Sequence, residues 1–176
     1  METNWFGTIL LVISIAVSDA RDYKLDLDGA ERLTNIPRSI PLPSRVEVYA
    51  AGCGLFIDKA GTPANLLNKA ADLSITNETD ILNLISVFQQ HDNKARIPNV
   101  AKHQGYTYHF LFVQEEQKTV IHFRVFEPSD TNTVWALVYP RSPSSFSFFN
   151  DKILTWLHSR MKPATAPPSP PCHDAK

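Results

Sequence analysis

The sequence contains few of the residues on which common catalytic and cofactor-binding motifs depend. Only 6 of its 176 residues are glycine, and none belongs to a glycine-rich phosphate-binding loop. The Gly-x-Ser-x-Gly, His-Glu-x-x-His and Cys-x-x-Cys motifs are also absent. We therefore expect no cofactor and no metal. The balance is against an enzyme, although residues distant in sequence can also assemble an active site.

An excess of charge of one sign is lacking as well. The chain has 17 basic and 18 acidic residues, which give a net charge of −1. Domains that bind nucleic acid usually carry a basic surface, so we predict no nucleic-acid partner. The hydrophobic content of 43% and the charged content of 20% are typical of a globular protein.

The longest apolar run without a charge, residues 6–17, is short. A transmembrane helix needs about 20 apolar residues, so we expect no integral membrane domain beyond a possible N-terminal signal or anchor. Ser18 and Ala20 place small residues at the −3 and −1 positions of a signal-peptide cleavage site, although residues 1–5 lack the usual basic residue. We favour a secreted or periplasmic protein over an uncleaved anchor or a buried element of an intracellular protein.

Cys53 and Cys172 are the only cysteines, so the chain can form at most one intramolecular disulfide. An exported protein enters an oxidising compartment, where such a bridge is stable. It would join the domain to residues 163–176, of which five are proline and which we expect to be an extended tail. The disulfide is therefore a possible feature of the exported protein.

Residues 106–113 and 119–126 are dense in aromatic and β-branched residues and are separated by a polar segment, which predicts a β-hairpin. If Glu116 and Gln117 form its tip, the register follows by counting outward. It places six large side chains on one face, in three facing pairs: Phe112 with Ile121, Phe110 with Phe123, and Tyr108 with Val125. A slip by one residue would destroy this coincidence.

The predicted fold class is α+β: a mainly antiparallel sheet of three to five strands with helices packed on one face. The hairpin, at residues 106–126, and a third strand, at about 134–139, form its centre. The predicted helices are 63–71, 77–89 and 151–162. The predicted regions are a signal peptide (1–20), an extended segment (21–45), one α+β domain (46–162) and the Pro-rich tail (163–176).

The opposite face of the hairpin carries the candidate binding residues His109, His122 and Arg124. In the predicted register His109 lies across from Arg124 and diagonal to His122. Two imidazoles and a guanidinium could hold an anion or, with a carboxylate added, a metal. The alternative is a partly solvated sheet face with no ligand.

These observations favour an exported, non-catalytic binding protein that acts through a protein partner, as an inhibitor or an immunity-type factor. A second hypothesis is a small-ligand-binding protein or enzyme that uses His109, His122 and Arg124. A third is a structural component of the cell envelope without a discrete site.

Overall fold

The computed structural model describes residues 23–34, 40–53, 63–90, 105–128, 137–140 and 148–161, and these form an α+β fold. The strands are β1 (Lys24–Leu25), β2 (Arg45–Cys53), β3 (Leu73–Ile75), β4 (Gly105–Gln114), β5 (Thr119–Pro128), β6 (Leu137–Pro140) and β7 (Phe148–Phe149). The helices are α1 (Gly29–Thr34), α2 (Pro63–Leu67), α3 (Glu78–Gln89) and α4 (Asp151–Arg160). The predicted signal peptide and the Pro-rich tail lie outside the described residues.

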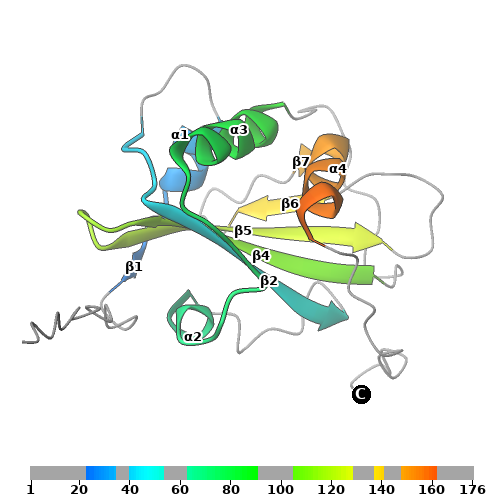
Figure 1. Cartoon of the computed structure of the whole chain (residues 1–176), viewed down its shortest axis with the longest axis horizontal. Coiled ribbons are helices and arrows are strands. Elements are labelled where there is room, and N and C mark those ends of the chain that lie inside the picture. Colours follow the sequence, from blue (N-terminus) through cyan, green and yellow to red (C-terminus); the bar gives the residue numbers. More distant parts are fainter. Residues whose placement is uncertain are drawn as a thin grey trace, which may run out of the picture.

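One mainly antiparallel sheet with the strand order β3-β2-β4-β5-β6-β7 forms the centre of the molecule (Figure 1). β1 joins it by pairing in parallel with the first two residues of β5. The sequence predicted three to five strands, and the structure has seven. The extra ones include β7, whose two residues are too few for a period-two pattern to be visible.

The hairpin register predicted from the sequence is confirmed. Phe112 pairs with Ile121, Phe110 with Phe123, and Tyr108 with Val125, and all six side chains are buried. Lys118 closes the turn with a φ of 51°, a left-handed conformation that is rare for residues other than glycine. The burial of a complete face thus fixed the register, although the turn carries no Asn-Gly or Asp-Gly signal.

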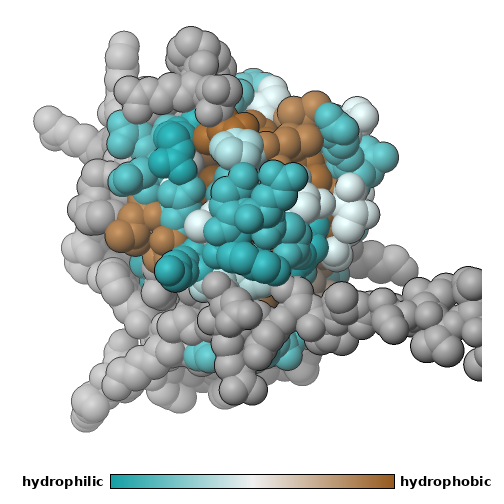
Figure 2. All heavy atoms as spheres, turned by 90° about the vertical axis from the view of Figure 1, so that its left-hand side faces the viewer, coloured by the Kyte–Doolittle hydropathy of each residue, from teal (hydrophilic) through white to brown (hydrophobic). Residues whose placement is uncertain are grey.

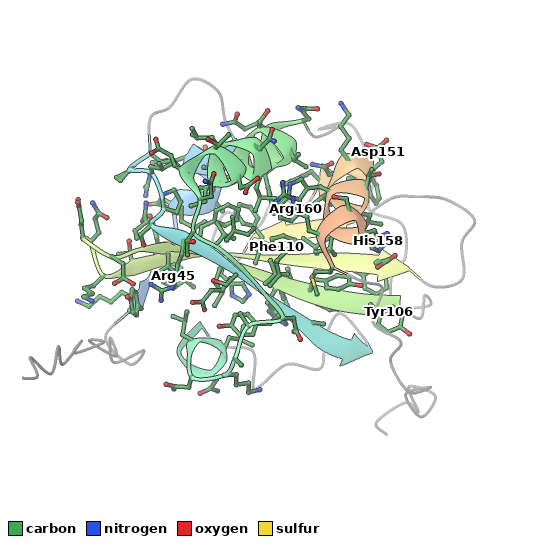
Figure 3. All side chains as sticks on the ribbon, in the orientation of Figure 1. Arg45, Tyr106, Phe110, Asp151, His158 and Arg160 are labelled. Carbon is green, nitrogen blue, oxygen red and sulfur yellow. The ribbon has the colours of Figure 1, made fainter. Side chains whose placement is uncertain are left out.

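The face that carries Phe110, Phe112 and Phe123, which we call the helix face, is covered by α1, α3 and α4 (Figure 1). Phe88 of α3 lies against all three rings, with centroid distances of 5.4, 5.3 and 4.7 Å. Phe110 projects from the sheet toward the helices (Figure 3). The main hydrophobic core therefore lies between this face and the helices.

The opposite face of the sheet, which carries His109, Leu111 and His122, is called the histidine face. Helix α2 lies on this side (Figure 1), and its Leu66 packs with Tyr49 and Leu111 in a second, smaller core. The expectation that all helices pack on one face was therefore wrong. α2 is short, and its apolar residues alone do not specify which side of the sheet they cover.

The predicted starts of the two longer helices are confirmed by their caps. The side chain of Asn77 accepts a hydrogen bond from the Asp80 N–H at the start of α3, and Asn150 accepts two at the start of α4. Helix α2 ends at Leu67, four residues earlier than predicted. Strand β6 covers residues 137–139 of the predicted third strand, and the predicted residues 134–136 lie outside the described residues. Among the described residues, no helix combines the length and hydrophobicity needed to span a bilayer.

The segment 21–45 was predicted to be extended, but helix α1 lies within it. The first residue of α1, Gly29, packs directly on the sheet. A Cβ atom at this position would lie 2.4 Å from Cγ1 of Ile121, which is fully buried, and 2.7 Å from a carboxylate oxygen of Asp26. The glycine is therefore required by the close approach of α1 to β5.

Replacing Gly29 with alanine is expected to lower the free energy of unfolding by about 1–3 kcal/mol, the usual effect of overpacking a core. Urea denaturation would measure the change. Ser86→Ala, at an exposed position of α3, is a suitable control. A Gly29→Ala protein as stable as the wild type would show that α1 does not need this close contact.

Candidate functional site

The structure brings together the three site residues predicted from the sequence. His109 of β4 pairs with Arg124 of β5, and His122 lies two register positions away, opposite Leu111. Nδ1 of His109 and Nε2 of His122 are 2.8 Å apart, and the ring centroids are separated by 5.1 Å. The two imidazoles are almost fully buried, with exposures of 0% and 1%.

The geometry of this histidine pair limits its protonation. In a hydrogen bond between two imidazole nitrogens, one carries a hydrogen and the other supplies a lone pair. The two rings therefore cannot both be doubly protonated while the bond persists. Among the described residues, no group of three or more histidine, cysteine or acidic side chains is arranged to hold a metal ion.

Tyr49 of β2 lies next to His109 in the sheet and adds a polar group that the sequence did not identify as part of the site. Its hydroxyl donates a hydrogen bond to Glu47, whose other carboxylate oxygen accepts one from Nε of Arg45 at 2.7 Å. The alternation in Arg45-Val-Glu-Val-Tyr49 could have predicted that these three polar side chains lie on one face, because residues two apart in a strand share a face. The histidine face thus carries a polar row that continues from β5 across β4 to β2.

Glu115, at the β4–β5 turn, links this row to the N-terminal strand. Its carboxylate accepts hydrogen bonds from Arg45 and from the hydroxyl of Tyr23, and the ammonium of Lys118 lies 3.3 Å away. The same ammonium lies over the Tyr23 ring, 5.1 Å from its centroid. Figure 3 shows Arg45 near this end of the sheet, far from Tyr106 at the other. Two distant segments, those of Tyr23 and Arg45, therefore converge on one carboxylate of the turn.

Two buried phenols in the structure are hard to ionise. Burial, together with the neighbouring Glu47, raises the pKa of the Tyr49 phenol above its usual range. Burial, together with the charge of Glu127, raises the pKa of Tyr108 in the same direction. Both phenols therefore keep their protons at a pH at which an unfolded tyrosine ionises.

We expect the protein to lose stability above about pH 10, the pKa of an unfolded tyrosine. The folded state then binds more protons than the unfolded state, so stability falls with rising pH by up to about 1.4 kcal/mol per unit for each phenol. Below pH 10 this contribution is fully present. Urea denaturation as a function of pH checks the slope. Tyr49→Phe and Tyr108→Phe should each reduce it, whereas Tyr106→Phe, at a position 37% exposed, should not.

A hollow of about 490 Å³ lies outside the core, at the end of the molecule that carries the β4–β5 turn. Its apolar lining comes from Leu25, Leu27 and Pro41, and Lys24 and Arg32 contribute charge. Leu27 is 47% exposed, which is high for a leucine beside a folded strand. Figure 2 shows this end of the molecule, where hydrophobic residues form patches above and to the left of a hydrophilic centre.

The described residues include only one of the two cysteines. Cys53 is the last residue of β2, whereas Cys172 lies outside the described residues. The disulfide between them stays a prediction.

The molecule thus carries a buried polar row on the histidine face and an open apolar hollow at the turn end of the sheet. No protein-family model matches the chain, and neither a curated protein nor a solved structure is significantly similar to it.

Proposed function

We propose that this protein is an exported, non-catalytic binding protein that acts through a protein partner, as an inhibitor or an immunity-type factor. The observation that carries the proposal is the contrast between the buried histidine pair and the open apolar hollow. The histidine pair is engaged within the fold and almost fully buried, whereas the hollow beside Leu27 opens to solvent. Exposed apolar surface rimmed by polar groups is characteristic of protein-interaction sites.

Export is supported by the apolar run at residues 6–17 and by the small residues that follow it. Sequencing the N-terminus of the mature protein from its native source tests this part, with Arg21 expected as the first residue. An intact Met1 on the secreted or periplasmic protein would contradict it. Mass measurement of the same sample with and without reduction shows whether Cys53 and Cys172 are joined.

The partner is tested by affinity capture from the native compartment, followed by reconstitution with each captured protein in purified form. Leu27→Asp should abolish the reconstituted complex, because it places a charge in the apolar hollow. Leu82→Asp is the matched control, since Leu82 is equally exposed, at 50%, but lies on α3 away from the hollow. If no purified candidate forms a complex, the proposal fails and a structural role in the envelope becomes the better explanation.

A second candidate is a small-ligand-binding or enzymatic site on the histidine face. It is favoured by the meeting of His109, His122 and Arg124, three groups suited to an anion. The double variant His109→Ala, His122→Ala separates the two proposals. A folded double variant that still binds the protein partner supports the first, and one that loses only small-anion binding supports the second.

A further inference from the structure

The backbone of β1 has an outer edge that the sheet does not use. The N–H groups of Lys24 and Asp26 both point toward β5 and donate to the carbonyls of Lys118, the residue before β5, and of Val120, at 2.9 and 2.8 Å. Because consecutive residues of a strand direct these groups to opposite sides, the N–H and C=O of Leu25 point away from β5. Among the described residues, no strand pairs with β1 on that side.

The apolar hollow lies against β1, between it and residues at the β4–β5 turn. Leu25 and Leu27 line it together with Lys24 and Asp26, so one segment of chain offers both unpaired backbone groups and apolar contacts. A chain that pairs with β1 would hydrogen-bond to Leu25 and could place one side chain in the hollow. Strand addition to a sheet edge draws its affinity from the backbone and its specificity from such side-chain sites.

The charge of the lining indicates which side chains a partner would bring. Lys24, Arg32 and Asp26 contribute two positive charges and one negative charge, a net of +1, and Asp26 is already paired with Arg32. Lys24 is exposed and forms no ion pair among the described residues. The site therefore favours an acidic residue beside an apolar one. A second copy of β1 would instead bring another Lys24 against the same surface, which like charges oppose.

We propose that an extended segment of a partner protein adds to the outer edge of β1, pairing with the backbone of Leu25. This segment places an apolar side chain in the hollow and an acidic side chain near Lys24. The proposal rests on the proposed function and specifies how the partner is recognised.

The test uses short random peptides displayed between flexible linkers and selected on the full-length protein, with the tightest peptide then synthesised as the probe. We expect selected peptides to combine apolar and acidic residues. Leu25→Pro removes the outward N–H without touching a hydrogen bond to β5, and proline is tolerated at such edge positions. Leu25→Ala keeps the N–H and loses the same leucine side chain, so it is the matched control.

Leu25→Pro is expected to weaken binding of the probe about tenfold or more relative to Leu25→Ala, the effect of losing one well-formed hydrogen bond. Lys24→Glu should weaken binding by a similar factor, and Lys69→Glu, at an exposed position elsewhere, should not. Melting curves of all four variants confirm that they fold.

Equal binding by Leu25→Pro and Leu25→Ala would overturn strand addition. If Leu27→Asp still abolished the complex with the native partner, the proposed function would stand with a different binding mode. Failure to select any peptide would also overturn the proposal. It would indicate that the short length of β1 and its lysine prevent another strand from pairing with this edge.

Discussion

Replacing Phe88 with alanine is expected to lower the free energy of unfolding by about 3–5 kcal/mol, the range for deleting a buried phenylalanine. Phe88 is fully buried, and its ring contacts three rings of the sheet, those of Phe110, Phe112 and Phe123. No other helix side chain makes so many ring contacts among the described residues. Urea denaturation followed by circular dichroism measures the change.

The control for this prediction is Leu82→Ala on the same helix, at a position 50% exposed, where we expect a change within about 0.5 kcal/mol. If the Phe88→Ala protein does not fold, Phe88→Leu keeps much of the volume and should cost less, about 1.5 kcal/mol or below. A decrease in the free energy of unfolding below about 1 kcal/mol for Phe88→Ala would show that Phe88 does not pack tightly between α3 and the sheet.

Acidification is expected to destabilise the protein below about pH 6.5, the pKa of an unperturbed histidine. The unfolded chain then binds a proton on both His109 and His122, whereas the folded pair binds one fewer while its 2.8 Å hydrogen bond persists. Since the unfolded state binds more protons, stability falls as the pH falls, by up to about 1.4 kcal/mol per pH unit. Arg124 opposite His109 further disfavours a second positive charge.

The dependence of stability on pH is measured by urea denaturation between about pH 7 and pH 5, above the range in which most carboxylates titrate. His122→Gln should flatten it, because one imidazole is removed while a neutral hydrogen-bonding group remains. His158→Gln is the control, since His158 lies on the surface of α4 beside Glu127. An unchanged slope in His122→Gln would contradict the link to the buried pair.

The parts of the fold predicted correctly are those in which neighbouring residues constrain one another. Three facing pairs fixed the register of β4 and β5, and they also placed His109 opposite Arg124. Helix α3 carried its own start signal in Asn77 and an apolar stripe that the structure buries completely. Local patterns of this kind predict structure well because the residues that form the strand or helix also provide the side chains that pack it into the core.

The parts that could not be predicted depend on contacts between distant segments. Helix α1 has six residues, too few to show a helical period, and its place on the sheet depends on Gly29 meeting Ile121. The role of Glu115 became visible only when Arg45 and Tyr23 were brought beside it.

The pairing of β1 with β5 has a consequence for how the chain matures. Tyr23 contacts Glu115, a residue 92 positions later, and β1 pairs just beyond it. During synthesis the first strand therefore leaves the ribosome long before its neighbour exists. Contacts between nearby residues form sooner than contacts between distant ones, so the hairpin can assemble first and β1 docks late. Until then the backbone of residues 24 and 25 has no partner strand, and its polar groups are hydrogen-bonded to water.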